Sequence, residues 1–554
     1  MSQLFRYFCL LNLEFDWMSL LIPLPFAFFA LNLIEKTYVS VLNYLDAELD
    51  IDEQEIKYFH EASRINLDKL NRSVATFAQF TLCSIFGLLV HGLTFGAENV
   101  GEAWLAGDHH IHSQFSVGWD RDFAPPSPII GGDAIYPIQV NALKAKYYGL
   151  SWMVSTDHGG PLHSRVNRDL AYPQLIKSRQ AVPEVVQFYG MEFDTPGADH
   201  SSLIIPFSDR EAEHLFTIES SWAKRERWPA DPSWDSEVRM LEALVAMGST
   251  QLKPVLIANH PSRSATDLGK LGLDEPNELR SWNETAPEIA VGMAGAPGHQ
   301  AATLNAFGGT NARGARGGYG RYPTLGGFDQ LTAVVGGFWD DMIGEGRNWW
   351  ITANSDSHVH FSEGGSDFWP GEYSKTYVWA HKNHDSVLES IRSGRIFVTT
   401  GDLINGITTE LISTMGHKVV FPGDQIDISN EDHLRLLVTI SYPGHANYNG
   451  DIVSINRVDV IAGLINEDQA LMDLVSPNAN SSTSVIKRFQ SGDWKEENNS
   501  ISFEIDLPMD RRADMYVRFR GTNTSELEPT PDARGEDPWK DLWFYTNPIR
   551  FITH

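Results

Sequence analysis

The sequence predicts an α/β fold followed by an all-β region. Short apolar runs alternate with helix-like segments up to about residue 400, and most of these runs end at a polar or charged residue. After that point, alternating β patterns replace the helical ones. Strand–helix alternation favours a largely parallel sheet or barrel. Because active sites of such folds lie at the carboxyl ends of the strands, a site is expected there.

The α/β region is predicted from individual segments. Buried strands are expected at residues 152–155, 185–189, 255–258 and 349–352. Helical periodicity predicts helices at residues 138–148, 236–246 and 384–392. Residues 307–327 are rich in glycine and arginine, which indicates a long mobile loop.

The C-terminal region reads differently. Alternating apolar residues predict strands at residues 434–440, 452–461, 501–505, 515–519 and 548–552. Turn residues separate these runs, a pattern typical of a β-sandwich. We therefore expect a hydrolase-like domain at residues 98–402 and a β-sandwich accessory domain at residues 403–554. The accessory domain would shield one face of the barrel or join two protomers.

The first 97 residues differ from the rest. Residues 17–34 and 74–95 are apolar, and the second run has a basic flank and a small-residue exit at Ala97. That layout is typical of a secretory signal, which would place the true start downstream of Met1 and the protein in the periplasm or outside the cell. Two membrane helices that anchor the protein, or two buried helices, are the alternatives.

Composition limits the chemistry. The chain has 554 residues and a formal net charge of -29, without a long basic run, which disfavours nucleic acid as a partner. Its two cysteines, Cys9 and Cys83, both precede residue 98. Thiolate ligands and a cysteine nucleophile are therefore excluded from the rest of the chain, and a metal site there would use His, Asp and Glu.

Histidines and carboxylates gather at five predicted strand ends. They are Asp108, His110 and His112; Asp157 and His158; Glu192, Asp199 and His200; His260; and Asp356 and His358. Residues two apart in a strand point to the same side, so His110 and His112 can bind one ion together. Each histidine alone would more often be a surface or core residue. The ordered set offers more ligands than one ion needs, and a carboxylate can bridge two ions.

These motifs, as an ordered set over about residues 101–402, resemble the polymerase-and-histidinol-phosphatase (PHP) superfamily of metal-dependent phosphoesterases. The similar segments are residues 107–113, 149–158, 190–200, 257–261, 353–358 and 389–401. The resemblance implies a distorted (β/α)7 barrel. It also implies two or three divalent ions, of zinc, manganese or iron. A secreted branch, similar to carbaryl hydrolases, adds β-structure as this chain does.

The resemblance also implies ligand roles. A first ion would be held by His110, His112, Glu192 and Asp356. Glu192 would bridge to a second ion held by His200 and His260, and His158 and His358 would belong to a third. Asp157 would be a ligand or would orient His158, and His109 would point away. Val117 stands where many members have a ligand, so Asp120 or Asp122 would substitute, or the third ion would be weak or absent.

The expected function is hydrolysis by a metal-bound hydroxide. His200 or Asp157 would protonate the leaving group, and Arg263, Arg316 and Arg321 would bind an anionic small-molecule substrate. A phosphomonoesterase or phosphodiesterase is the leading hypothesis. A carboxylic ester, amide or carbamate hydrolase is the alternative, and a non-catalytic metal-binding module is a third. The sequence leaves the oligomeric state open.

Overall fold

A computed structural model describes residues 101–320, 322–413, 416–429, 433–465, 479–508 and 513–553. The predictions for residues 1–97 and for Arg321 lie outside these residues. Val100–His554 form one compact unit. Within the described ranges, no helix is long and apolar enough to cross a membrane.

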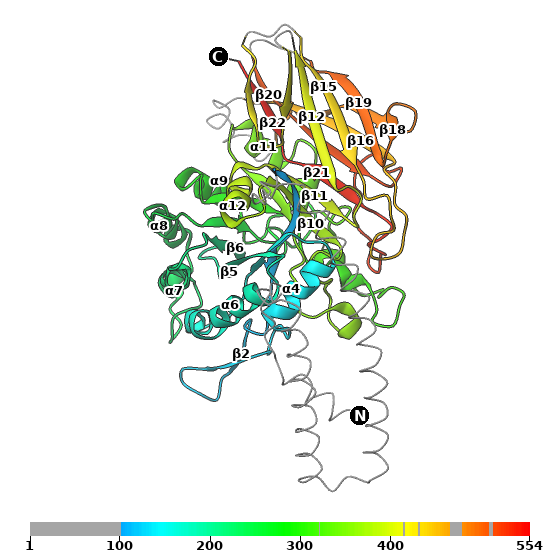
Figure 1. The fold of residues 1–554 in the computed structure, drawn as a ribbon. Coiled ribbons are helices and arrows are strands. Elements are labelled where there is room, and N and C mark those ends of the chain that lie inside the picture. The colour runs from blue at the N-terminus through cyan, green and yellow to red at the C-terminus, as the bar shows by residue number, and fades with distance from the viewer. Residues whose placement is uncertain are drawn as a thin grey trace, which may run out of the picture. The chain divides into compact units, whose positions relative to one another are not determined.

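A large mixed sheet forms the centre of this unit (Figure 1). Its first part has the spatial order β1 (Ala103–Ile111), β4 (Trp152–Ser155), β5 (Val186–Asp194), β6 (His200–Ile205), β7 (Val255–Ala258), β8 (Ala290–Ala296) and β9 (Trp350–Ala353). Strand β6 is antiparallel to both neighbours, and the other adjacent pairs in this part are parallel. The carboxyl ends of six strands therefore share one edge with the beginning of β6.

Helices alternate with the strands along this part of the chain, as the sequence predicts. They are α4 (Ile138–Tyr147), α6 (Tyr172–Ala181), α7 (Glu211–Trp222), α8 (Glu237–Gly248), α9 (Pro276–Thr285) and α12 (His384–Ser393), with the short α5 (His163–Val166), α10 (Gln330–Ala333) and α11 (Phe338–Gly344). Helix α8 begins where the Ser236 side chain accepts a hydrogen bond from the Arg239 N–H, and Asn383 caps α12 in the same way. Helix α12 ends at Gly394, whose φ of 74° suits glycine.

The same sheet continues into the C-terminal region. From β1 it runs through β10 (Ser374–Ala380), β11 (Ile396–Thr400), β21 (Trp543–Thr546), β20 (Asp514–Thr522) and β22 (Ile549–Ile552) to β14 (Gln425–Asp427). Strands β16 (Arg457–Ile465) and β17 (Ser484–Gln490) extend it from β20. The sheet therefore continues across the predicted domain boundary at residue 402, because β11, which precedes the boundary, pairs with β21, which follows it.

A second, antiparallel sheet packs on this continuation (Figure 1). Its order is β13 (Gly416–Val420), β12 (Gly406–Ser413), β15 (Arg435–Ser441), β19 (Ser500–Asp506) and β18 (Lys495–Glu497). Val438 and Phe503 of this sheet share one apolar core with Val458 and Phe519 of the large sheet. Two sheets around a common core are the arrangement that alternating strand patterns favour.

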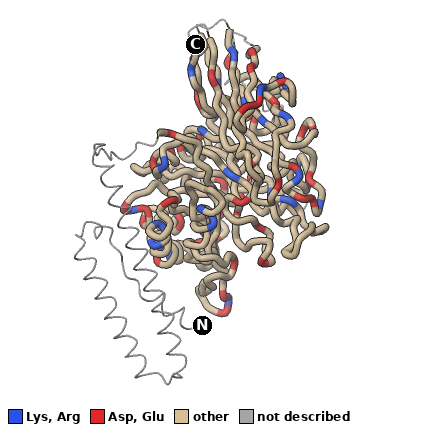
Figure 2. Tube along the Cα trace, turned by 45° about the vertical axis from the view of Figure 1, so that its right-hand side comes forward, with Lys and Arg blue, Asp and Glu red and all other residues tan. Residues whose placement is uncertain are grey.

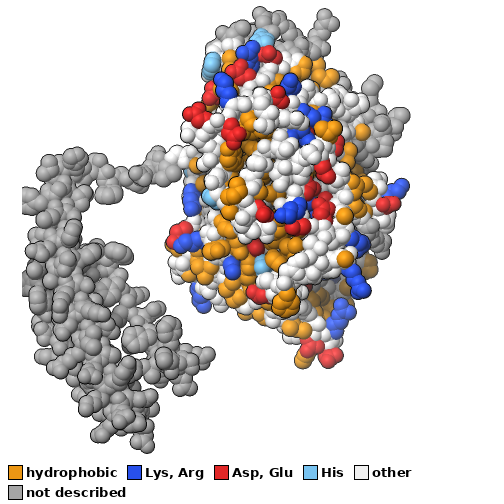
Figure 3. Space-filling model, turned by 90° about the vertical axis from the view of Figure 1, so that its right-hand side faces the viewer, with side chains coloured by type: hydrophobic (Ala, Val, Ile, Leu, Met, Phe, Trp, Pro, Cys, Tyr) orange, Lys and Arg blue, Asp and Glu red, His pale blue; other side chains and the backbone are white. Residues whose placement is uncertain are grey.

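The fold class is therefore mixed α/β, with one large mixed sheet and smaller antiparallel sheets. A two-stranded hairpin, β2 (Gly118–Asp120) and β3 (Ser127–Ile129), projects from the α/β part (Figure 1). The segment 307–327 contains one short 3-10 turn, Arg316–Gly318, between irregular stretches. Acidic and basic residues are interspersed along the described chain (Figure 2), and the face in Figure 3 mixes hydrophobic and charged side chains.

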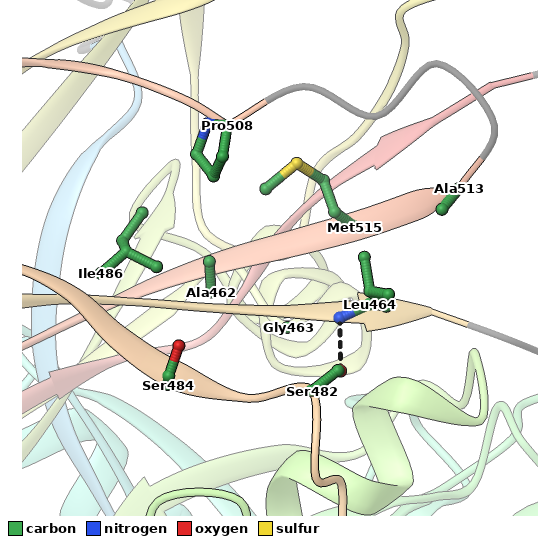
Figure 4. A pocket seen from close by; sticks show the side chains of 9 residues that line it. All are labelled: Ala462, Gly463, Leu464, Ser482, Ser484, Ile486, Pro508, Ala513 and Met515. Atoms are coloured by element: carbon green, nitrogen blue, oxygen red, sulfur yellow. Dashed lines mark hydrogen bonds between the residues drawn. The ribbon is translucent and has the colours of Figure 1, made fainter.

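A hollow lies in the C-terminal region (Figure 4). Its lining is largely apolar and includes Ala462, Leu464, Ile486, Pro508 and Met515. None of the lining residues is a histidine or a carboxylate. The chemistry that the sequence predicts must therefore be sought at the strand ends of the α/β part.

Candidate metal centre

The first group of possible ligands comes from three strand ends. His110 lies in β1, His112 directly follows it, Glu192 lies in β5, and Asp356 follows β9. His110 Nε2 is 3.1 Å from Glu192 Oε1 and 3.0 Å from Asp356 Oδ1. His112 Nε2 is also 3.0 Å from Asp356 Oδ1. All four side chains are buried, and their ligand atoms lie within 4.8 Å of one another.

Glu192 belongs to a second group as well. Its Oε1 is 3.1 Å from both His200 Nδ1 and His260 Nε2. His260 follows β7, whereas His200 begins β6, which runs in the opposite direction. The beginning of an antiparallel strand meets the ends of its neighbours, so the reversal brings His200 to the same edge.

A third group consists of His112, His158 and His358. Asp133, from the loop between β3 and α4, contacts His158 and His358. Its Oδ2 is 3.0 Å from His158 Nε2 and 3.4 Å from His358 Nε2. A carboxylate therefore does complement the third group, but it comes from neither of the two positions that the sequence suggested.

The two suggested positions lie in the β2–β3 hairpin instead. Asp120 is in β2, and its carboxylate accepts a hydrogen bond from the Asp122 N–H. Asp122 itself is exposed. Asp133 takes the place suggested for Asp120 or Asp122, because the chain passes through the whole hairpin before it returns to the histidines.

His299 and Asp367 complete the centre, and the sequence analysis missed both. His299 follows β8, and its Nε2 is 2.8 Å from Asp356 Oδ2. Its Nδ1 is 2.5 Å from Asp367 Oδ1. Strand β8 has the sequence AVGMAGA, in which five of the seven residues are alanine or glycine, unlike the apolar runs that marked the other strands. The available signal was a histidine three residues after an apolar run, as at the other strand ends.

The loops that carry these groups adopt unusual backbone conformations. His260, Asp356 and His299 have φ values of 31°, 47° and 57°. Non-glycine residues rarely adopt positive φ, and such strain clusters at functional sites. Gly298 lies so close to Asp356 that an added Cβ would come within 2.0 Å of the Asp356 Cβ. The chain therefore needs glycine at this position.

Asp157 lies behind the centre and is enclosed. Its carboxylate accepts hydrogen bonds from the Ser113 N–H at 2.6 Å, the Ser113 hydroxyl at 2.8 Å and the Ser116 hydroxyl at 3.0 Å. His112 Nδ1 is 2.8 Å from Ser116 Oγ. Because the Ser116 hydroxyl donates to Asp157, it accepts from His112, which directs His112 Nε2 towards the ligand groups. Asp157 thus orients His112 rather than His158, and it is too enclosed to protonate a substrate.

Asp108 and His109 also support the centre from behind. Asp108 accepts hydrogen bonds from the backbone N–H groups of His110 and Ser355, which joins the ends of β1 and β9. His109 points away, with ring nitrogens 3.0 Å from Ser202 Oγ and 2.8 Å from Thr352 Oγ1. Burial lowers the pKa of His109 to about 3, which suits a neutral, hydrogen-bonded imidazole.

The charges of the centre are strongly coupled. Burial alone would raise the pKa of the Glu192 carboxyl, but His200 and His110 hold it well below its usual range. Asp356 behaves in the same way, because His110 and His299 outweigh its burial. Burial lowers the pKa of His260 to about 4 and that of His112 well below normal. Neighbouring carboxylates in turn outweigh burial and raise the pKa of His200 and His299, and that of His358 to about 9. The centre thus combines ionised carboxylates with both neutral and protonated imidazoles, and a bound metal ion would take the place of the protons on its ligands.

The donor set fits metal ions better than it fits hydrogen bonding. Nε2 of His110 lies 2.9 Å from His112 Nε2, 3.1 Å from Glu192 Oε1 and 3.0 Å from Asp356 Oδ1, although a ring nitrogen carries at most one proton to donate. Glu192 Oε1 has three imidazole nitrogens at 3.1 Å. Nδ1 of His110, His158 and His260 is buried without a hydrogen-bond partner in the described part of the chain. These buried groups could therefore hold metal ions.

The arginines divide into two kinds. Arg263, about one-third exposed, lies beside the second group, with its guanidinium 2.7 Å from Asp199 Oδ1 and 3.4 Å from His200 Nδ1. Arg316 is fully buried, where it donates to Gln300, Tyr373 and the Asp541 carbonyl. The prediction that Arg316 binds substrate is therefore wrong, because a buried and fully engaged guanidinium cannot reach a ligand. Arg321 lies outside the described residues.

Comparison with known proteins adds no assignment. No protein-family model matches the sequence, and no curated protein shows significant similarity to it. The function must therefore be inferred from the geometry of this centre.

Proposed function

We propose that this protein is a metal-dependent hydrolase of the PHP type, with a phosphomonoester or phosphodiester as its substrate. The observation that carries the proposal is the overlap of the three ligand groups. Glu192 belongs to two of them, and its Oε2 lies 3.7 Å and 3.9 Å from Nε2 of His112 and His158. A shared carboxylate at the edge of parallel strands is the arrangement expected for ions that act together.

Bound ions would supply a water with a pKa near 7 and would offset negative charge that develops on the substrate. The remaining tasks fall to side chains. Arg263 would hold an anionic substrate oxygen beside His200. His200, whose side chain is 14 % exposed, would reach the leaving group and deliver a proton to it.

We further infer that the strands of the α/β part close into a distorted barrel. Strand β9 lies at one end of the path, yet the Ala353 N–H donates to Thr376 Oγ1 in β10 at 2.8 Å. The Ile351 N–H likewise donates to the Asn547 side chain at 2.9 Å, directly after β21. These side-chain bonds support closure without a continuous backbone ladder.

A carboxylic ester, amide or carbamate is the second candidate substrate. The β2–β3 hairpin and the loop after it expose Phe123, Ile129, Ile130 and Ile135, each by more than 40 %. Asp133 lies in this same loop and contacts His158. An apolar rim beside the centre favours a substrate with an apolar group, and the burial of Arg316 removes one cation that an anionic substrate would use.

Activity assays separate these possibilities. We expect the metal-supplemented full-length protein to hydrolyse p-nitrophenyl phosphate or bis-p-nitrophenyl phosphate faster than p-nitrophenyl acetate. The opposite order would favour the ester hydrolase. Full metal binding without activity on any of the three would support a non-catalytic metal-binding module and would contradict the proposal.

A further inference from the structure

His299 occupies a position that the proposed function leaves unexplained. Its two ring nitrogens lie against two different carboxylates, Asp356 Oδ2 at 2.8 Å and Asp367 Oδ1 at 2.5 Å. Carboxylate oxygens accept hydrogen bonds, so both ring nitrogens donate. Asp356 therefore has one oxygen bound to His299, while its other oxygen faces His110 and His112.

Asp367 is itself fixed in place. Its Oδ2 accepts hydrogen bonds from the backbone N–H groups of His358 and Val359, at 2.7 Å and 3.1 Å. The Asp367 side chain is 2 % exposed. Asp367 thus connects the loop after β9 to His299 after β8, and its carboxylate has little freedom to move.

The loop that carries His299 is shaped for this contact. Gly298 permits the close approach to Asp356, and the φ of 57° at His299 turns the ring towards it. The next residue, Gln300, donates to the Pro297 carbonyl and accepts from Arg316 Nε at 3.1 Å. Backbone strain of this kind persists only where the surrounding structure holds it.

We infer that His299 is a positioning residue, which holds Asp356 by Oδ2 and leaves Oδ1 to bind an ion with His110 and His112. Asp367 supports His299 from behind. This inference rests on the proposed metal centre and deepens it, because it assigns a role to two residues that are not ligands of the first group. Partners that orient a ligand typically contribute 10- to 100-fold to metal affinity.

The test measures Mn²⁺ stoichiometry and affinity by titration of the full-length, metal-stripped protein. The variants are His299→Gln, Asp367→Asn and Asp356→Asn. His163→Gln is the matched control, because His163 is a buried histidine 2.7 Å from Glu219 and lies outside the ligand groups. Thermal unfolding of each variant shows whether it folds.

We expect His299→Gln and Asp367→Asn to retain the wild-type stoichiometry and to weaken one Mn²⁺ about 10- to 100-fold. His163→Gln should leave the affinity unchanged. In an Asp356→Asn background, His299→Gln should have little further effect, since both changes act through one carboxylate.

Three results would overturn the inference. They are unchanged affinity in both His299→Gln and Asp367→Asn, additive effects of His299→Gln and Asp356→Asn, and loss of one whole ion in His299→Gln, which would make His299 a ligand. If His299→Gln fails to fold, unchanged Mn²⁺ affinity in Asp367→Asn overturns the inference by itself, and weakened affinity supports it. A wild-type protein that binds no Mn²⁺ would instead contradict the proposed function itself.

Discussion

Two clusters of acidic side chains show different ways to stabilise negative charge. At the strand ends, Glu192 and Asp356 are surrounded by imidazoles. In the C-terminal part, Asp532, Glu536 and Asp541 are equally close together, but Arg316 lies 3.5–3.6 Å from all three. Arg316 gives its cluster one permanent positive charge, and burial raises the pKa of Asp532 and, to about 7, that of Glu536. The imidazoles around Glu192 and Asp356 can instead exchange their protons for metal ions. Proximity of carboxylates alone therefore does not indicate a metal site.

The largest effect should follow from Glu192→Gln, which removes the carboxylate that the ligand groups share. We expect metal affinity to fall more than about 100-fold and hydrolysis to fall with it, because a direct ligand matters more than an orienting partner. Metal titration and initial rates measure this. Asp532→Asn is the control from the other cluster and should leave the metal content unchanged. Equal metal content in Glu192→Gln and the wild type would mean that the shared carboxylate does not bind metal, and the proposed difference between the two clusters would be wrong.

Arg316→Met should affect stability instead of metal binding. Removal of one partner of a buried ion pair typically costs about 3–5 kcal/mol, because the remaining charges lose their compensation. Urea unfolding of metal-free protein measures the loss, and Arg316→Lys, which keeps the charge, should recover part of it. A change in the free energy of unfolding below about 1 kcal/mol would contradict the neutralising role.

A third buried site tests the pH dependence of a balanced histidine–carboxylate pair. Burial lowers the pKa of His163, but Glu219 outweighs it and raises the pKa to about 9. The unfolded value is about 6.5, so the stabilisation is complete below about pH 6.5 and is lost as the pH rises through about 9. Without metal, the free energy of unfolding of the wild type should exceed that of His163→Gln, and this difference should fall by about 3 kcal/mol between these two pH values. A pH-independent difference would refute this.

Arg263→Ala should have the smallest effect. Asp199 already engages this guanidinium, so we expect the KM for p-nitrophenyl phosphate to rise about 10-fold while kcat changes little. The KM for p-nitrophenyl acetate serves as the internal control and should stay the same. An equal rise in KM for both substrates would mean that Arg263 stabilises the structure of the site and does not bind the anionic group of the substrate.

Much of the fold, and many of the residues that gather at the candidate centre, could be predicted because each strand end carries its own local signal. The strands at residues 152–155 and 255–258 lie where the sequence places them. Each strand alternates faces with a fixed period, so His110 and His112 face one direction whatever the rest of the chain does.

The missed features depend on contacts between distant segments. Asp133 reaches His158 only after the β2–β3 hairpin, and Arg316 is buried only because residues 532–541 surround it. Strand β8 consists mostly of alanine and glycine, so the sequence did not mark it as a strand and His299 was not recognised at its end. No local pattern reveals such long-range pairing. The reversal of β6 and the continuation of the sheet through β21 and β20 could not be predicted for the same reason.

The central claim is that the imidazole-rich cluster binds metal ions and that these ions support hydrolysis. The most direct measurement is the metal content of the full-length protein after supplementation, together with hydrolysis of p-nitrophenyl phosphate, for the wild type and a His110→Ala, His112→Ala double variant. We predict two or three ions per wild-type chain, and loss of both metal and activity in the variant. Fewer than about one ion per wild-type chain, or full activity in the variant, would contradict the claim.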